Sequence, residues 1–575
     1  MRFLNWDIKG FEREVAVGLC QSGVSPLVAV LMASRYGDKP EEITSFLDTD
    51  LAPYHDPFLM QDMDKAVAHI KKAIEKKERI AIYGDYDVDG MTSTAVLALW
   101  LTSKNADFEI FIPKRANGSE CSADGYGLNI NALDILKENG VKLVVTVDCG
   151  ITATQEARHA KKIGIGLVIT DHHECRDLLP DADAVINPKR PDCKYPYKSL
   201  AGVGVAFKLV CALEGDHLSD EIFNRYGRFL ALGTVADVMP VTGENRKLIC
   251  AGLNVLNKNP GVGLKKLIDE TCKDTDNITT STIGFVLAPR LNAAGRMGDP
   301  MLSVKLLLTE DAIEAESLVG ELCSLNNDRR SLEQKIYDSA MTMLPKDEPD
   351  EPIILGSDKW NQGVTGVVAS RIAERFKLPT IIISISEAGI GRGSCRSNSG
   401  FDIYSALDSC KDILINYGGH TKAAGMDIEP KNIDELRCRI TDIYNTFKSE
   451  NSGAYGLFVD FEVEKPDLLT LSNIEALRNL EPFGNENPVP CLCIKNAKLT
   501  AMQSIGSGKH TRMKIEKSGT IFACIFFSVP AEDLNIAIGD DVDIAFEPQI
   551  NEFRGSSSVQ LQLQDIRSSM SRYKT

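Results

Sequence analysis

The sequence lacks several features that mark secreted, zinc-bound or membrane proteins. Its 15 cysteines are odd in number and form no C-x-x-C pair, so we expect neither disulfides nor structural zinc and infer a reducing compartment. No run of about 18 apolar residues occurs, which excludes a membrane-spanning helix. The N-terminal MRFLNWDIKGFERE carries acidic residues and no apolar stretch. We therefore expect no signal peptide and a cytoplasmic location.

The chain also lacks an excess of positive charge. Its net charge is −17, whereas a protein that coats nucleic acid through electrostatics alone is usually basic. This balance argues against nonspecific coating of DNA, although it leaves room for a local basic groove. A site of carboxylates for divalent metal would itself add to the acidic count. At 575 residues the chain is too long for one hydrophobic core, so several domains are expected.

The order of apolar patterns predicts an α/β protein. Residues 1–75 are expected to form a helical N-terminal extension, and residues 76–305 a first α/β domain. In that domain short β-branched segments alternate with helical ones, which predicts a doubly wound, mainly parallel sheet. The strands expected there are RIAIY, FEIFI, KLVVTV, GLVIT and AVIN. Ligands of such sheets lie at the carboxyl ends of the strands.

The second half of the chain divides into three further parts. Residues 306–348 are expected to form a long connector helix, because a helical period runs through them without proline. Residues 349–452 form a smaller α/β domain in which GRGSCRS is expected to be a glycine-rich turn. From 453 to 575 short alternating segments predict an OB-like β-barrel. These segments are LFVDFEVE, CLCIKNAKLT, TRMKIEK, IFACIFF, DVDIAFEP and SVQLQLQDI.

Three aspartates follow the first predicted strand, in the stretch DYDVDG. Asp85, Asp87 and Asp89 are spaced like the start of a calcium-binding EF-hand loop. An EF-hand needs a helix before the loop and a glutamate at loop position 12, whereas here a strand precedes it and Val96 holds that position. The EF-hand is therefore excluded. A solvated acidic turn and a catalytic metal site remain as alternatives.

Three other stretches place acidic or histidine side chains at strand ends or in loops. Taken singly, an aspartate after a strand is commonly a helix N-cap, and adjacent histidines are commonly surface residues. Because parallel strands open onto one sheet edge, however, these carboxylates would converge and repel unless cations lay among them. Carboxylates and imidazole suit manganese, and carboxylates also suit magnesium. Two such ions about 3.5–4 Å apart commonly hydrolyse phosphoesters. The stretches are VVTVDCG with Asp148, LVITDHHE with Asp171, His172 and His173, and LGTVADVMP with Asp237.

Taken together, the stretches DYDVDG, VDCG, TDHHE and ADVMP resemble the four motifs of the DHH phosphoesterases. RLNAAGRM, WNQGVTGVVASRIAERF, GRGSCRS and GGHTKAAG resemble the connector and DHHA1 domain of the RecJ family, and LEPFGNENPVP its OB-type domain. The resemblance covers nearly the whole chain. It implies a metal-dependent, single-strand-specific 5′→3′ DNA exonuclease that releases 5′-mononucleotides in repair and recombination, with two Mn²⁺ or Mg²⁺ ions as cofactors.

The resemblance also implies a role for each motif residue. Asp148 would bridge both metal ions, His173 would contact the scissile phosphate, and Asp171 would orient the imidazoles beside it. The implied metal ligands are Asp87, Asp89, Asp148, His172 and Asp237.

One position departs from the pattern of many family members. They carry histidine four residues before the first ligand aspartate, where this sequence has Tyr83. A neutral phenol is a poor substitute for imidazole as a ligand. Our hypothesis is that the first metal site relies on Asp85, water or substrate oxygens and binds more weakly.

Substrate contacts are expected in the first α/β domain and in the smaller one. Arg115, Ser394 and Arg396 resemble a pocket for a 5′-terminal phosphate, with GRGSCRS forming an anion nest. The alternative for GRGSCRS is an ordinary turn with exposed arginines. His420 is expected to face the metals, the alternative being a buried structural histidine. Three further residues are candidate DNA-backbone contacts or, equally, solvated or ion-paired helix residues: Arg290, Asn292 and Arg296.

Specificity for single strands is expected to come from a narrow cleft and from bases stacking on the aromatics of the barrel. Alternation places about half of these aromatics in the barrel core. The candidates are Phe458, Phe461, Phe522, Phe526 and Phe527.

Two other functions compete with the exonuclease. One is a phosphodiesterase for short oligonucleotides or small molecules of the same superfamily, although such chains usually lack the barrel. The other is a noncatalytic replication scaffold, although such relatives lose metal ligands that this chain keeps. The expected partner is single-stranded DNA with a 5′ end, with a single-strand-binding protein and a helicase considered as loading factors. We expect a monomer with no membrane association.

Overall fold

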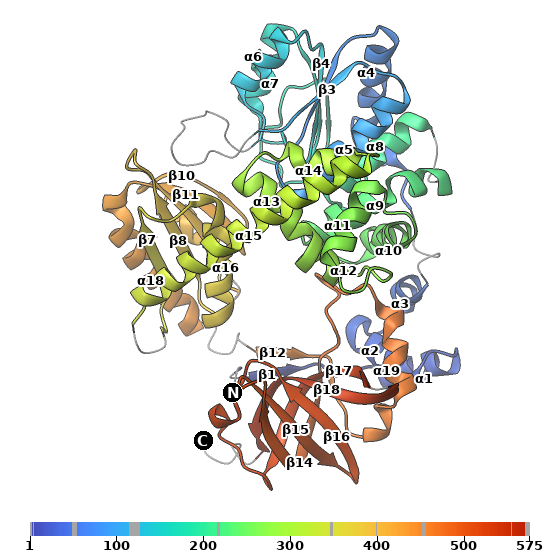
Figure 1. The fold of residues 1–575 in the computed structure, drawn as a ribbon, viewed down its shortest axis with the longest axis vertical. Coiled ribbons are helices and arrows are strands. Elements are labelled where there is room, and N and C mark those ends of the chain that lie inside the picture. The colour runs from blue at the N-terminus through green and yellow to red at the C-terminus, as the bar shows by residue number, and fades with distance from the viewer. Residues whose placement is uncertain are drawn as a thin grey trace. The chain divides into compact units, whose positions relative to one another are not determined.

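The computed structural model describes residues 3, 5–48, 54–113, 127–215, 219–345, 349–397, 400–450, 456–553 and 555–569. The chain forms two compact units (Figure 1). We call Pro53–Ser452 the central unit, and Met1–Ala52 together with Gly453–Thr575 the terminal unit. The N-terminal extension expected over 1–75 is thus shared between the units, because helix α4 (Met63–Glu75) belongs to the central one. Among the described residues, no helix combines the length and apolarity needed to span a membrane.

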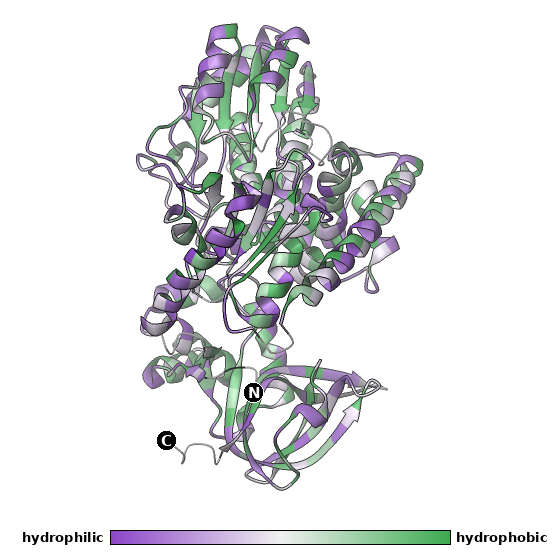
Figure 2. Ribbon diagram, turned by 90° about the vertical axis from the view of Figure 1, so that its left-hand side faces the viewer, coloured by the Kyte–Doolittle hydropathy of each residue, from purple (hydrophilic) through white to green (hydrophobic). Residues whose placement is uncertain are grey.

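The first sheet of the central unit confirms the predicted α/β architecture. All its strands run parallel, in the order β3-β2-β4-β5-β6. Their sides are covered by helices, which is why the sequence shows continuous β-branched runs instead of alternation. Figure 2 shows hydrophobic colouring along these strands. The strands are β2 (Ile80–Tyr83), β3 (Phe108–Phe111), β4 (Leu143–Val147), β5 (Gly166–Thr170) and β6 (Ala184–Ile186).

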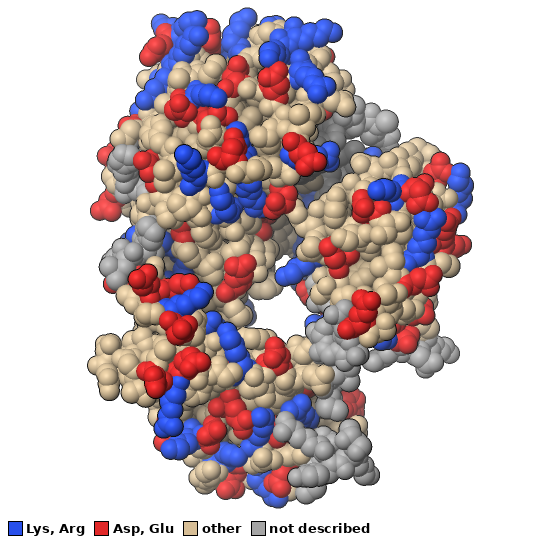
Figure 3. Space-filling view, turned by 180° about the vertical axis from the view of Figure 1, so that it is seen from behind, with Lys and Arg blue, Asp and Glu red and all other residues tan. Residues whose placement is uncertain are grey.

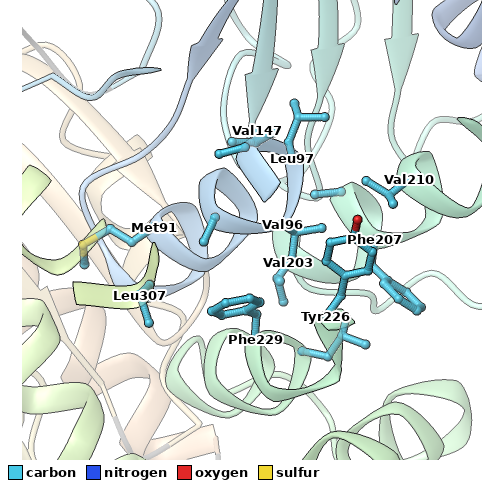
Figure 4. Close-up of a cluster of buried hydrophobic side chains, with 14 of the residues drawn as sticks. Met91, Val96, Leu97, Val147, Val203, Phe207, Val210, Tyr226, Phe229 and Leu307 are labelled. Carbon is cyan, nitrogen blue, oxygen red and sulfur yellow. The ribbon is translucent and has the colours of Figure 1, made fainter. Parts of the chain in front are cut away.

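Helices cover both faces of this sheet. Ile80 and Ile82 point into the core shared with α5 and α8, whereas Ala81 and Tyr83 point into the core with α6 and α7. Figure 4 shows the first core, where side chains from α5, α8 and α9 meet Val147 of β4. This packing fixes α5 and α8 beneath the carboxyl edge of the sheet. The helices are α5 (Val88–Ser103), α6 (Ile130–Glu138), α7 (Thr154–Ile163), α8 (Gly202–Glu214) and α9 (Asp220–Ala236).

A helical region follows the first sheet and leads into the connector. Helix α15 (Ala312–Met343) occupies the segment expected to be a connector helix. It packs against α13 (Ala288–Met297), which continues directly from a π-helical turn at Ile283–Leu287. The other helices of the region are α10 (Gly243–Lys258), α11 (Val262–Thr271), α12 (Thr280–Thr282) and α14 (Met301–Leu308).

The second sheet of the central unit is mixed. Its order is β10-β11-β9-β8-β7, and only β7 and β8 run parallel. The strands are β7 (Ile353–Ser357), β8 (Thr380–Ile385), β9 (Gly391–Arg396), β10 (Leu414–Gly419) and β11 (Ala423–Ile428). Helices α16 (Gln362–Phe376), α17 (Ile403–Asp408) and α18 (Ile433–Glu450) complete this part.

The stretch GRGSCRS corrects one prediction. It is not a glycine-rich turn, because Gly391–Arg396 form β9, which pairs with β8 on one side and β11 on the other. Glycine leaves room for the Met426 side chain of the adjacent strand β11, since a Cβ on Gly393 would lie 2.6 Å from it. Gly, Ser and Arg have low β-propensity, so the sequence did not indicate a strand here. Pairing with β8 and β11 stabilises it. Because the ladders use its backbone N–H groups, β9 does not form an anion nest.

The terminal unit contains the predicted barrel. Five strands close into a ring because β14 pairs with both β15 and β17. They are β14 (Leu492–Ile505), β15 (His510–Lys517), β16 (Thr520–Phe526), β17 (Asp541–Phe553) and β18 (Ser556–Ser568). The expected first strand LFVDFEVE is divided between β12 (Gly456–Val459) and β13 (Phe461–Glu462). Only β13 joins the barrel sheet, whereas β12 pairs in parallel with β1 (Asn5–Ile8) at the other end of the sequence.

Helices from both ends of the sequence complete the terminal unit. Side chains of α2, among them Leu27 and Leu31, share one hydrophobic core with barrel residues such as Phe461 and Phe546. The helices are α1 (Arg13–Gln21), α2 (Pro26–Tyr36), α3 (Pro40–Leu47) and α19 (Leu471–Glu475).

Charged side chains of both signs are interspersed over the molecular face drawn in Figure 3. Many charged residues of the described chain form exposed pairs, such as Lys161 with Asp181 at 2.7 Å. Exposed pairs of this kind contribute little to stability, typically about 0–1 kcal/mol.

Candidate metal centre

The loop DYDVDG connects β2 to α5 and carries three carboxylates. Asp87 is the N-cap of α5, and its Oδ1 accepts a hydrogen bond from the Gly90 N–H at 3.1 Å. Gly90 is required because a Cβ there would lie 2.6 Å from the carbonyl oxygen of Asp85. Asp85 and Asp89 are 2% and 1% exposed. The loop therefore holds two buried carboxylates beside the positive end of a helix.

The carboxylate of Asp89 is held by the N-terminus of a second helix. Its oxygens accept hydrogen bonds from the backbone N–H groups of Gly202 at 2.6 Å and Val203 at 2.8 Å, at the start of α8. A Cβ on Gly202 would lie 2.5 Å from Oδ1 of Asp148, so only glycine fits. Sequence reasoning missed this element. The glycines of AGVGVAFK at a helix start were the available signal.

Asp148 follows β4 in a strained backbone conformation. Its φ is +63°, a region that residues other than glycine rarely adopt. Its Oδ1 lies 3.1 Å from Nε2 of His172, and no hydrogen-bond donor from the described residues meets that oxygen. Strain at a buried carboxylate persists only where the surroundings enforce it, which is common at functional sites.

Asp171 organises the histidine stretch after β5. One oxygen accepts the backbone N–H of Ile151 at 2.8 Å, and the other accepts those of His172 at 2.7 Å and His173 at 3.1 Å. The same second oxygen lies 2.7 Å from Nδ1 of His173. Burial raises the pKa of Asp171, but the hydrogen bond and charge of His173 outweigh it and lower the pKa to about 2. Asp171 therefore stays ionised and orients His173.

Asp237 reaches the cluster from the end of α9. Its Oδ2 lies 3.6 Å from Nε2 of His172, and Oδ2 of Asp89 lies 3.7 Å from the same nitrogen. Three carboxylates from three separate segments thus surround one imidazole. The structure brings together all the residues that the four motifs contribute.

The geometry yields three overlapping sets of potential ligands. In each set, one oxygen or nitrogen from each residue lies within 4.8 Å of the others. Asp148 and His172 each belong to two of the sets. The sets are Asp85 with Asp87 and Asp148, Asp89 with His172 and Asp237, and Asp148 with His172 and His173.

The protonation behaviour of these acids fits a site for divalent cations. Burial and then neighbouring carboxylates raise the pKa values of Asp85, Asp148 and Asp237 well above the usual range. The same two causes raise the pKa of Asp89 to about 7. Together with Asp148, the Oδ1 of Asp85 also lacks a hydrogen-bond donor from the described chain. A hard donor set of oxygens and imidazole, destabilised by its own charge, suits Mn²⁺ or Mg²⁺.

The two histidines of the stretch behave in opposite ways. Burial is the main cause that lowers the pKa of His172, to about 3, so its imidazole is neutral and able to ligate a metal. Burial also lowers the pKa of His173, but the hydrogen bond and charge of Asp171 raise it to about 9. His173 is therefore a cation when no metal is bound.

Tyr83 lies on the far side of β2 from the first core. Its ring packs with α6 and α7, stacks on Phe111, and its hydroxyl donates to the Gly127 carbonyl at 3.0 Å. The Tyr83 hydroxyl also accepts from Asn129 at 3.1 Å, whereas Asp85 forms a potential ligand set with Asp87 and Asp148. The structure thus places Asp85, and not Tyr83, beside Asp87.

Two of the expected phosphate-binding residues, Ser394 and Arg396, lie on β9. Ser394 and Arg396 share one face of the strand, because side chains alternate. Ser394 Oγ lies 3.0 Å from Thr365 Oγ1, and Arg396 Nε donates to Ser370 Oγ at 3.1 Å, both on α16. Arg115 lies outside the described residues.

Three predicted DNA contacts lie on α13 and make hydrogen bonds within the protein. Asn292 Oδ1 accepts the Val88 N–H at 3.1 Å, and Arg290 Nη1 donates to the carbonyl of Val286 at 2.6 Å. Arg296 Nη1 donates to the Gly363 carbonyl at 3.4 Å. Asn292 therefore acts on the metal loop directly, which sequence reasoning did not anticipate.

His420 and a nearby lysine show that the two parts of the central unit face each other. His420 lies in the turn between β10 and β11, and its pKa is lowered by burial and then by the charges of Lys189 and His173. Lys189 also pairs with Glu174 at 2.9 Å, directly after the two histidines. Asn187 fixes this arrangement, since it donates to the His173 carbonyl and accepts the Lys189 N–H. Lys189 was not identified from the sequence, because nothing in the loop segment NPKR marks this lysine as functional.

The aromatic candidates of the barrel separate by burial, as alternation predicted. Phe461, Phe522 and Phe526 are core residues. Phe458 and Phe527 are each 44% exposed and remain as surfaces on which bases can stack.

Comparisons with known proteins agree with this architecture. Family models match residues 79–234 as the N-terminal domain of the DHH family, 350–446 as a DHHA1 domain and 459–565 as a RecJ OB domain. The chain is 39% identical to the single-stranded-DNA-specific exonuclease RecJ of Bacillus subtilis, over 98% of this chain and 70% of that protein. The Dickeya dadantii protein of the same name is 34% identical, over 93% and 96% of the two chains.

Solved structures give the same result. A crystal structure of RecJ from Thermus thermophilus in complex with Mn²⁺ superposes with a TM-score of 0.82 at 28% identity, covering 98% of this chain and 79% of that one. A second structure, of exonuclease RecJ bound to manganese, has a TM-score of 0.56 at 34% identity and covers 67% of this chain and 94% of that one.

Proposed function

Because this chain belongs to the RecJ family of DHH phosphoesterases, we propose that it is a metal-dependent exonuclease that degrades single-stranded DNA from the 5′ end and releases 5′-mononucleotides. One observation carries this proposal. Asp148, strained and 2% exposed, belongs to two ligand sets at the carboxyl edge of the parallel sheet. A carboxylate shared by two sets is what a pair of cations in hydrolytic phosphoester chemistry requires.

We assign the first cation site to Asp85, Asp87 and Asp148, and the second to Asp89, His172 and Asp237. Asp148 is assigned to both, because its Oδ1 lies 3.1 Å from Nε2 of His172. When bound, two divalent cations would lower the pKa of a shared water and take up negative charge from the scissile phosphate.

The chain itself supplies orientation and charge around that chemistry. Asp171 holds the His173 ring through Nδ1, and the imidazolium can donate its Nε2–H to a phosphate oxygen. The backbone N–H groups of Gly202 and Val203 hold the Asp89 carboxyl group in place. Ser394 and Arg396 on β9 are assigned to the terminal 5′-phosphate, for which arginine offers paired N–H donors. Arg115 and His420 are expected to complete that pocket.

The proposed setting is DNA repair and recombination in the cytoplasm. The partner is single-stranded DNA, for which Phe458 and Phe527 offer stacking surfaces. A single-strand-binding protein and a helicase remain proposed loading factors, and the chain is proposed to act as a monomer.

Digestion of DNA labelled at its 5′ end tests the activity and its direction together. With Mn²⁺, a 5′-phosphorylated single strand is expected to release labelled mononucleotide first, and a chelator is expected to abolish the release. A phosphorothioate linkage at the 5′ end should block digestion, whereas the same linkage at the 3′ end should not. Blunt duplex of the same sequence should be resistant.

Two variants separate the proposed centre from the rest of the loop that follows β5. Asp171→Asn is expected to lower the rate strongly, because it releases His173. Asp177→Asn, on the same loop but exposed, should leave the rate unchanged. Hydrolysis of dinucleotides alone would favour a phosphodiesterase for small substrates. Binding of single strands without hydrolysis would favour a noncatalytic scaffold.

A further inference from the structure

Helix α13 is docked on the metal loop without any intervening side chain. A Cβ on Gly295 would overlap the carbonyl oxygen of Tyr86, which precedes Asp87. Asn292 of the same helix accepts the N–H of Val88, which follows Asp87. The helix thus contacts the loop on both sides of one proposed metal ligand.

The last turn of α13 is docked equally closely on α16. A Cβ on Gly363 would lie 2.7 Å from the carbonyl oxygen of Arg296, and Arg296 Nη1 donates to the Gly363 carbonyl at 3.4 Å. Gly363 lies in the first turn of α16, where Asn361 caps its N–H at 2.8 Å. The last turn of α13 therefore meets backbone on two sides, the metal loop at Gly295 and α16 at Arg296.

Helix α16 in turn contacts the side chains assigned to the terminal phosphate. Thr365 lies 3.0 Å from Ser394 through their hydroxyl oxygens. A Cβ on Gly366 would lie 3.1 Å from Nη2 of Arg396, whose Nε donates to Ser370. A continuous path thus leads from Asp87 through α13 and α16 to Ser394 and Arg396.

We propose that the last turn of α13, wedged between the metal loop and α16, is the spacer that sets the separation of the metal centre and the Ser394–Arg396 phosphate site to one nucleotide. This inference rests on the proposed function and deepens it. Backbones that pack against each other through glycine form a stiff contact. The distance between the metal centre and the Ser394–Arg396 site is therefore fixed when the substrate binds. A terminal phosphate held at one end then places the next phosphodiester at the other. An error of about 1 Å in such placement can cost about 100-fold in rate.

Gly363→Ala tests the spacer because the added methyl group must push α16 away from α13 while leaving both chemical sites intact. Rates are measured on two single strands that differ only in a 5′-phosphate or a 5′-hydroxyl. We expect the ratio of these rates to fall at least about tenfold relative to wild type. Dinucleotide should also become detectable among the first products.

Binding to the metal-free protein is the second measurement. Fluorescence anisotropy with the same two strands should show that Gly363→Ala keeps the preference for the 5′-phosphate, because Ser394 and Arg396 move together with α16. Arg396→Ala should lose that preference in binding as well as in rate. This binding assay also shows that the variant is folded.

Two further variants control for the substitution. Gly320→Ala lies on α15 with nothing within 4 Å of its Cβ, so the rate ratio should match wild type. Arg296→Ala removes a hydrogen bond without adding bulk, and a smaller fall in the same ratio is expected. If Arg296 only contacted DNA, both strands would lose rate equally and the ratio would not change.

The outcomes separate the spacer from the function on which it rests. A wild type that prefers the 5′-phosphate, with a Gly363→Ala variant that keeps this rate ratio and releases only mononucleotide, overturns the spacer alone. Equal losses on both strands also overturn it. A wild type without any preference for the 5′-phosphate overturns the phosphate site of the proposed function, and the spacer with it.

Discussion

The two units contain buried carboxylates in opposite surroundings. In the terminal unit Asp460 is 1% exposed, pairs with Arg35 at 2.8 Å and accepts the Cys491 N–H at 3.0 Å. In the central unit Asp148 is about as deeply buried, but most of its neighbours are other acids, and the nitrogen 3.1 Å from its Oδ1 belongs to the neutral imidazole of His172. The first carboxylate is satisfied by the protein and stabilises it. The second is left for a cation, at a cost to the metal-free fold.

Asp148→Asn should give the largest effect and shows the functional side of the comparison. Loss of the shared ligand is expected to lower exonuclease activity about 10⁴-fold or more, roughly 5 kcal/mol on the barrier. The metal-free variant should melt at a higher temperature than wild type at pH 7, because its amide carries no charge to repel the neighbouring acids. Calorimetry with and without Mn²⁺ checks this. A lower melting temperature in the metal-free state would contradict it.

Arg35→Ala tests the structural side of the comparison. It leaves Asp460 buried without its ion-pair partner and should cost about 3–5 kcal/mol of unfolding free energy. Denaturant unfolding followed by Trp6, which donates to Asp565 in the terminal unit, provides the measurement. Arg35→Lys should lose less, because the charge remains. Mn²⁺ affinity of the central unit should match wild type in both variants, and a change there would mean that the two regions are not independent.

Asp171→Asn extends the comparison of buried carboxylates into the metal centre, because Asp171 already has hydrogen-bond partners within the protein. The pKa of His173, about 9 in the metal-free protein, should fall when the charge of Asp171 is removed. Since this folded-state pKa is raised, its contribution to stability is present below about pH 6.5 and is lost as pH rises through about 9. Asp171, with its depressed pKa of about 2, contributes above about pH 4 and loses the contribution toward pH 2. Imidazole NMR across pH measures the shift, and an unchanged His173 pKa would refute the pairing.

Tyr83→Phe should give the smallest effect. It removes hydrogen bonds to Gly127 and Asn129, which is worth about 1 kcal/mol. Both Mn²⁺ affinities should remain those of wild type, because Asp85 and not Tyr83 lies in the ligand set. Tyr83→His, which restores the residue found in many relatives, should likewise leave metal affinity unchanged. Tighter binding in that variant would revive the hypothesis that the phenol weakens the first site.

Much of the fold and of the metal centre could be predicted from local patterns. Buried parallel strands appear as β-branched runs, so β2 to β6 were visible with nearly correct ends. The rule that such strands open onto one edge then predicted that Asp89, Asp148 and His172 converge. The strand before the DYDVDG loop and Val96 at loop position 12 excluded the EF-hand. The roles of the single metal-site residues came from the resemblance to the DHH family.

What could not be predicted depends on neighbours distant in the sequence. β9 contains little of the usual strand composition and exists because β8 and β11 hold both its edges. The bond between Asn292 and Val88 spans 204 positions, and no local signal marks it. The division of LFVDFEVE likewise follows from the pairing of β12 with β1.

That last pairing also sets an order of assembly during synthesis. Residues 5–48 are synthesised well before their partners, which begin at Gly456. At about 5–20 residues per second, some 20–80 s pass before those partners are made. The whole central unit is translated in that interval and can fold first. Residues 5–48 are therefore buried late although they are made early, and until then the apolar face of α2 is a target for chaperones.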